Sequence, residues 1–201
     1  MKTAAKPAWE GLTVACLASG PSLTAEDCEV VRASGVPTLV TNTTFRMAPW
    51  AAIVYGHDSK WWLHYGAEVA RTCTGRRLAS LWGARAYGAE PITGCGWYAT
   101  RYNSGVDIVG IAIAAGAARV VLLGFDCQRT GGKVHWHGDH PATLGNGGSM
   151  PKWPAKFQAL AKEARRVGCD VLNASRETAL TCFPRAGLGL ALQATPERMA
   201  A

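Results

Sequence analysis

The feature that most limits the fold of this chain is the regular alternation of short apolar runs with longer helix-forming segments. The apolar runs are bounded by Gly, Pro, Asn or Asp, and such runs predict buried strands. The segments between them carry helix caps or amphipathic spacing, and they predict helices. Strands are predicted over residues 13–19, 38–41, 51–55, 78–82, 119–123 and 171–173, and helices over residues 25–33, 59–70, 104–115 and 155–167.

This alternation predicts an α/β fold with Rossmann-like βαβ units, a mainly parallel sheet and helices on both of its faces. At 201 residues the chain is long enough to bury a core without a disulfide or a structural metal. We expect one domain over residues 1–184, within which residues 127–153 form a His- and Gly-rich active-site loop. Residues 185–201 are predicted to be a peripheral tail, and residues 83–102, rich in Gly and aromatic side chains, a loop.

The composition, 48% hydrophobic and 17% charged, is that of a globular protein. A formal net charge of +7 favours a polyanionic partner such as a nucleotide, nucleic acid or acidic glycan. The seven cysteines include no CxxC pair, which predicts free thiols in a reducing, cytoplasmic compartment. The apolar run at residues 12–17 is short for a signal peptide, and no run approaches the ~20 apolar residues that span a membrane.

The turn after the first predicted strand contains Ser19, Gly20, Pro21 and Ser22. Ligands of parallel sheets gather beyond the carboxyl ends of the strands. Gly20 would permit close approach, and the turn amides with the Ser22 hydroxyl are suited to hold a phosphate or a ribose. The alternative is an ordinary strand-to-helix turn. The turn is not GxGxxG and lacks a Walker lysine, so neither a dinucleotide fold nor a P-loop is supported.

Further polar residues lie at predicted strand ends or at a helix start: Asn42, Asp58, Asp126, Asn103, Ser104 and Gly105. Asn42 and Asp58 are suited to bind a base edge or a ribose hydroxyl, although turns also favour these residue types. The amides at the helix start, with Ser104, would hold an anion or simply cap the helix. Asp126 would orient a substrate hydroxyl or, alternatively, cap the loop that follows it.

The sharpest local motif is His135-Trp136-His137-Gly138-Asp139-His140. As a string it matches the HxHxDH pattern of metallo-β-lactamase-like hydrolases, in which His and Asp side chains bind two zinc ions. We reject that interpretation because the fold needs further His ligands downstream and no His follows His140. Three alternatives remain: a single metal site, loop histidines without a role, and a general base whose unperturbed pKa of about 6.5 suits proton transfer.

The order of these motifs resembles the bacterial sialyltransferase-like superfamily of small Rossmann-like glycosyltransferases. It also resembles the related hydroxymethylpterin-diphosphokinase-like proteins, many of which are encoded by phages. Four blocks carry the resemblance: CLASGPSL at residues 16–23, the strand end at residues 41–42, residues 103–106 with 120–126, and the His-bearing loop followed by a helix and residues 173–180.

The resemblance implies a glycosyltransferase that uses a nucleotide-sugar donor and requires no metal or other cofactor. Gly20, Ser22 and Asn42 would bind the donor nucleotide, and Ser104 and Gly105 would lie against the donor. His140, with His137 as the second choice, would be the general base toward an acceptor hydroxyl on a glycan or on modified phage DNA.

Two departures weaken the match to sialic acid in particular, because Ser19 and Asp58 stand where the sialyltransferases carry Asn. Two alternatives to the glycosyltransferase therefore stay open. One is a metal-dependent pyrophosphokinase-like enzyme, with its metal held by Asp58, Asp126 or Asp139. The other is a non-catalytic nucleotide-binding phage protein.

Overall fold

The computed structural model describes residues 4–92, 101 and 103–193. Its central feature is a sheet of seven strands in the order β5-β4-β3-β2-β1-β6-β7, in which every pair of neighbours is parallel. The strands are β1 Thr13–Leu17, β2 Thr38–Thr41, β3 Ile53–Gly56, β4 Arg76–Ala79, β5 Glu90–Pro91, β6 Arg119–Leu123 and β7 Asp170–Asn173. The predicted Rossmann-like α/β fold is thereby confirmed.

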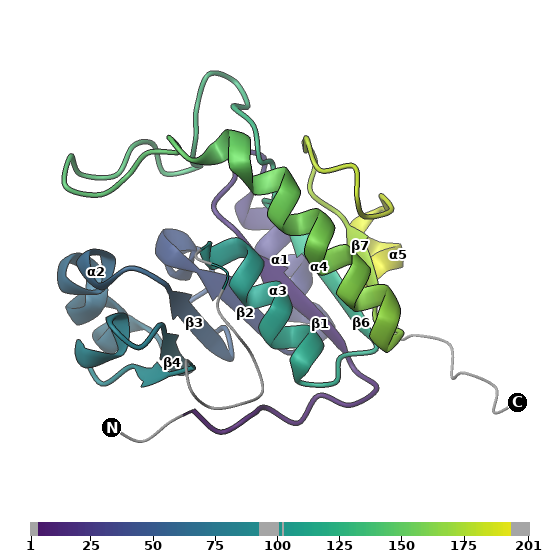
Figure 1. Ribbon diagram of the computed structural model, residues 1–201, viewed down its shortest axis with the longest axis horizontal. Coiled ribbons are helices and arrows are strands. Elements are labelled where there is room, and N and C mark those ends of the chain that lie inside the picture. Colours follow the sequence, from purple (N-terminus) through teal and green to yellow (C-terminus); the bar gives the residue numbers. More distant parts are fainter. Residues whose placement is uncertain (1–3, 93–100, 102, 194–201) are drawn as a thin grey trace, which may run out of the picture.

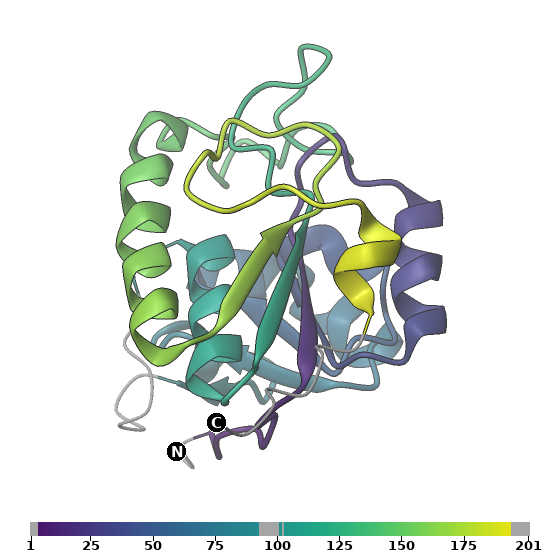
Figure 2. The same ribbon diagram turned by 90° about the vertical axis from the view of Figure 1, so that its right-hand side faces the viewer.

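Helices cover both faces of this sheet, as Figures 1 and 2 show from two directions. α3 and α4 pack on one face, and α1, α2 and α5 pack on the other. A sheet that is covered on both sides buries its strands fully, which explains why β1 and β6 are continuous apolar runs in the sequence. The helices are α1 Ala25–Ser34, α2 Ser59–Thr72, α3 Ser104–Ala114, α4 Trp153–Val167 and α5 Leu188–Leu192.

Local signals in the sequence account for the helix ends. Thr24 and Asp27 form a reciprocal capping box at the start of α1, and Gly35 ends that helix with φ 71°. Gly168 ends α4 in the same left-handed conformation, with φ 74°. Among the described helices, none is both long and apolar enough to cross a bilayer.

Residues 83–102 contain more structure than the loop predicted from the sequence. A short 3-10 helix covers Gly83–Arg85, and β5 at Glu90–Pro91 pairs with β4 at the edge of the sheet. The Arg76 guanidinium binds the Glu90 carboxylate at 2.9 Å across the two strands. A two-residue edge strand that contains proline has no alternating pattern, so the sequence gives no signal for it. Residues 93–100 and 102 of the predicted loop lie outside the described residues.

Part of the segment predicted to be a peripheral tail packs on the body of the fold. Within residues 185–193, α5 contacts α1, and its residues Ala191 and Leu192 are buried in the core on that face. The Ala186 amide also donates to the Asn173 carbonyl at the end of β7. A helix of one turn and a half is too short to show an apolar period. Residues 194–201 lie outside the described part.

Candidate functional site

The order of the strands creates a crevice at the carboxyl edge of the sheet. The chain runs outward from β1 to β5, and α3 then carries it back to β6, which lies beside β1. The connections that leave β1 and β6 therefore diverge in opposite directions, and ligands of open parallel sheets bind at such a switch point. A cavity of about 370 Å³ lies at this point.

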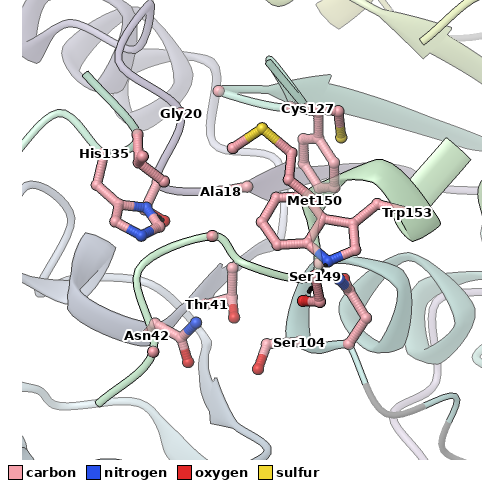
Figure 3. Close-up of a pocket in the computed structure, with 18 of the residues that line it drawn as sticks. Ala18, Gly20, Thr41, Asn42, Ser104, Cys127, His135, Ser149, Met150 and Trp153 are labelled. Carbon is pink, nitrogen blue, oxygen red and sulfur yellow. Dashed lines mark hydrogen bonds between the residues drawn. The ribbon is translucent and has the colours of Figure 1, made fainter. Parts of the chain in front are cut away.

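The walls of the cavity come from segments that are far apart in the sequence. Residues 18–20 follow β1, residues 41–42 end β2, and residues 124–125 follow β6. Figure 3 shows His135 on one side of the cavity and Met150 and Trp153 on the other, with Asn42 and Ser104 along the lower edge of the view. The cavity thus joins strand ends, a helix start and the loop at residues 127–149.

The cavity brings together most of the residues that the sequence singled out. Those that line it are Ser19, Gly20, Asn42, Asp58, Asn103, Ser104, Gly105 and His140. Four further predicted residues, Pro21, Ser22, Asp126 and His137, do not line it, although the structure describes each of them.

A close contact within the protein requires glycine at position 20. A Cβ atom at this position would overlap the Asp126 carboxylate and the Gly124 carbonyl oxygen. The Gly20 N–H donates to that carbonyl at 2.8 Å, and the Ser22 N–H donates to Asp126 at 3.0 Å. The Leu23 N–H donates to the Gly20 carbonyl. These turn amides are already occupied, which removes the amide part of the predicted phosphate site.

Asp126 links the turn after β1 to the loop after β6 through hydrogen bonds. Its carboxylate accepts hydrogen bonds from the Ser22 amide, from the Ser22 hydroxyl at 2.7 Å and from the Thr130 hydroxyl at 2.8 Å. The side chain is 1% exposed. Of its two predicted roles, capping the loop is the one that this geometry fits.

The start of α3 faces the cavity with a capped helix end. The Asn103 side chain accepts a hydrogen bond from the Val106 amide at 3.0 Å. The Ser104 hydroxyl accepts one from the His57 amide at 3.2 Å, which ties this helix to the end of β3. Because helix N-termini carry partial positive charge, this edge of the cavity favours an anionic group.

A buried polar network behind the start of α3 was missed by the sequence analysis. Asp107 is fully buried and accepts hydrogen bonds from the Tyr55 hydroxyl at 2.8 Å and from the Arg101 amide at 2.7 Å. The His57 Nδ1 atom lies 3.3 Å from the same carboxylate. A single Asp in a helix that is otherwise apolar was the signal that would have revealed the network.

The three histidines of the HxHxDH motif gather into one cluster beside the cavity. Their ring centroids lie 5.1 Å apart for His135 and His137, 4.8 Å for His135 and His140, and 4.6 Å for His137 and His140. A turn closed by the Gly138 N–H, which donates to the His135 carbonyl at 3.1 Å, lies between them, and Gly138 has φ 84°. His135 lines the cavity together with His140. It belongs to the motif, but only His137 and His140 were predicted to be catalytic.

Two polar residues hold this cluster in place. The Ser19 carbonyl accepts from the Trp136 amide at 3.0 Å, and the Ser19 hydroxyl lies 3.0 Å from His135 Nδ1. Asn146 binds the backbone of His140 twice, accepting from its N–H and donating to its carbonyl at 3.2 Å. Hydrogen bonds therefore hold the ring of His135 and the backbone of His140, in a segment where residues 127–149 form neither an α-helix nor an extended strand.

Burial controls the charge of the histidine cluster. It is the main cause that lowers the pKa of His135 to about 4 and that of His137 to about 3, and the neighbouring His140 lowers both further. Burial also lowers the pKa of His140, against the opposing effect of Asp139. The three imidazoles are therefore uncharged at neutral pH, and each retains a nitrogen lone pair.

The rest of the cavity wall carries little charge. Among the described residues that line it there is no Lys or Arg, and Asp58 is the one carboxylate. The Cys127 thiol also lines the cavity, but burial raises its pKa to about 12. It is therefore protonated at neutral pH and is a poor nucleophile.

Fold and cavity together define a Rossmann-like α/β protein with a ligand-sized cavity at its switch point. No family model matches the chain, and no curated protein or solved structure matches it either. The resemblance to the sialyltransferase-like superfamily therefore stays a prediction.

Proposed function

We propose that this protein is a glycosyltransferase that binds a nucleotide-sugar donor in the cavity between β1 and β6. One observation carries the proposal: Asn42, the start of α3 and His140 converge on this cavity from three separate parts of the chain. A volume of about 370 Å³ lies within the range of ordinary small-molecule sites, roughly 300–1,000 Å³.

The start of α3 is the best place for the donor phosphates. Ser104 and Gly105 line the cavity there, and the helix dipole attracts negative charge. The same amides and hydroxyls would stabilise the charge that develops on the leaving nucleotide as the sugar–phosphate bond breaks. This role belongs to α3 because the amides after β1 are occupied within the protein.

The remaining walls suit the base or sugar and the acceptor. Asn42 lines the cavity with a side-chain amide that can donate and accept hydrogen bonds, and Trp153 and Met150 provide an apolar surface (Figure 3). In this proposal the uncharged imidazole of His140 accepts the proton of an acceptor hydroxyl. The net charge of +7 supports a polyanionic acceptor such as an acidic glycan or modified DNA.

The structure gives less support to a pyrophosphokinase. That reaction needs a divalent metal held by carboxylates. Of the three candidates, Asp126 is occupied by Ser22 and Thr130, Asp139 does not line the cavity, and Asp58 alone lines it. A non-catalytic nucleotide-binding protein would have the same cavity, and only a turnover assay separates it from the enzyme.

The proposal is tested by the thermal stability of the purified chain with a panel of nucleotides and nucleotide-sugars. We expect stabilisation by one nucleotide class without added metal, of about 2.7 kcal/mol at 100 times its dissociation constant. Transfer of the sugar from that donor is then measured with glycan and DNA acceptors. Stabilisation by ATP only in the presence of magnesium would favour the kinase, and no stabilisation by any nucleotide would refute both enzymes.

Asn42→Gly provides the matched variant. Asn42 has φ 50°, a conformation that glycine adopts without strain, so this change removes the side chain alone. We expect the variant to keep its stability without ligand and to lose most of the stabilisation by nucleotide.

A further inference from the structure

The three histidines of the cluster lie nearly close enough to bind one metal ion together. One nitrogen from each of His135, His137 and His140 lies within 4.8 Å of the other two. In a tetrahedral zinc site the nitrogens bind at 2.0–2.1 Å, which places them roughly 3.4 Å apart. Side-chain rotations would have to shorten the nitrogen–nitrogen separations, which are at most 4.8 Å, to that value.

Two of these rings have buried nitrogens without a hydrogen-bond partner. Within the described residues, neither His137 Nε2 nor His140 Nδ1 has one. His140 is only 8% exposed, so water does not readily replace the missing partner. A buried polar atom without a partner costs free energy, and a bound cation removes that cost for each of these atoms that it binds.

The surroundings of the cluster resemble the support that metal-binding histidines usually have. The Ser19 hydroxyl lies 3.0 Å from His135 Nδ1, which leaves His135 Nε2 to bind a cation. Asn146 fixes the backbone of His140 through two hydrogen bonds. Both residues lie outside the HxHxDH string, so the arrangement depends on the fold and not on the motif alone.

We infer that His135, His137 and His140 bind a divalent first-row transition-metal cation beside the cavity, with at least one coordination position left for a ligand. Imidazole nitrogens suit Zn²⁺ and its neighbours in the first row, whereas Mg²⁺ and Ca²⁺ prefer oxygen ligands. Three protein ligands with an open position are typical of catalytic rather than structural zinc sites.

Such a cation would supply the positive charge that the cavity wall lacks. The described lining has no Lys or Arg, and His135 and His140 both belong to it. A phosphate or hydroxyl oxygen of a molecule in the cavity would therefore meet the open coordination position. The inference changes one part of the proposed function, because in the metal-loaded protein His140 is a ligand and not the proton acceptor.

The test is a titration of the full chain with Zn²⁺ after removal of bound metal by a chelator. We expect one Zn²⁺ per chain, measured by elemental analysis and by competition with a chromophoric chelator. Co²⁺ in the same site should give the visible spectrum of a four- or five-coordinate ion. Binding that does not saturate near one equivalent would overturn the inference.

Variants locate the cation. His137→Ala and His140→Ala should each weaken Zn²⁺ binding by at least ~100-fold, and Ser19→Ala by about tenfold. His64→Ala is the matched control: His64 is an exposed histidine on α2 that lowers the pKa of His140, so its loss should not weaken Zn²⁺ binding. Unchanged affinity in the double variant of His137 and His140 would refute the site.

Two precautions keep the test decisive. If His140→Ala does not fold, His137→Ala is used instead, because His137 is only half-buried. Circular dichroism checks that this variant is folded. Nucleotide binding is measured separately on the metal-free protein. Stabilisation by nucleotide without Zn²⁺ binding would overturn the metal site alone, and the reverse result would overturn the proposed donor site alone.

Discussion

The Asp126 carboxylate and the missing side chain of Gly20 belong to one contact between the ends of β1 and β6. The turn after β1 fits against Asp126 because Gly20 has no Cβ, and two hydrogen bonds from Ser22 then hold the carboxylate. Ser22 and Asp126 are 104 positions apart in the sequence. The sequence predicted that Gly20 permits close approach, and in the structure its close neighbours are Asp126 and Gly124. A flexible turn near a ligand and a close contact between loops require the same glycine.

Gly20→Ala tests this contact. The added methyl group would overlap buried atoms of Gly124 and Asp126, so we expect a loss of about 1–3 kcal/mol in the free energy of unfolding. Urea denaturation measures the change. Gly187→Ala is the control, because its Cβ would meet no atom within 4 Å and its φ is −65°. A Gly20→Ala protein as stable as this control would contradict the assignment.

At the scale of elements, two segments that the sequence left without regular structure turn out to be attached to the fold. α5 packs beside α1, and the loop at residues 127–149 is attached through the Ser19 contact with His135 and through the Thr130 bond to Asp126, which in turn holds Ser22. The contacts of α5 with α1, of Ser19 with His135 and of Asp126 with Ser22 join distant parts of the chain. Local patterns predict helices and strands, but they carry no information about such contacts.

Leu192→Ala tests the attachment of α5. Leu192 is 8% exposed within the core on this face, so its truncation should cost about 2 kcal/mol or more of stability. Leu190 lies on the same helix but is 64% exposed. Leu190→Ala should therefore change stability by less than about 0.5 kcal/mol. Equal effects of the two substitutions in chemical denaturation would show that α5 does not pack as described.

Asn146→Ala tests the order of the loop. The substitution removes both hydrogen bonds to the backbone of His140 while it leaves the strands and helices unchanged. We expect faster amide hydrogen exchange within residues 127–149 and a loss of global stability of only about 1 kcal/mol. Exchange that accelerates equally in β1 and β6 would instead show that the loop and the sheet open together.

For the whole molecule, the sequence was enough to predict the class of fold, and most of the residues that it singled out lie at one cavity. β1 and β6 are apolar runs with clear ends, and parallel strands place the residues that follow them at one edge. The network around Asp107 and the hydrogen bonds of Ser19 were not predictable in this way. They depend on the order of strands in the sheet and on side-chain directions, which a local pattern does not contain.

A truncation tests the dependence of the sheet on its second half. A chain ending at Ala118 lacks β6, α4 and β7, and it leaves β1 unpaired on one side. It also lacks Phe157 and Leu160, which cover the face formed with α3. We expect no cooperative thermal transition by circular dichroism. A sharp transition in this fragment would show that residues 1–118 fold as an independent unit.

The central place of β1 also has a consequence for synthesis on the ribosome. β1 is made well before its partner β6 at Arg119–Leu123, because β2 to β5 and α1 to α3 lie between them in the sequence. Until then the nascent chain exposes an apolar strand edge that can pair with another chain. The yield of this protein should therefore depend on chaperones that bind nascent chains and on the rate of translation.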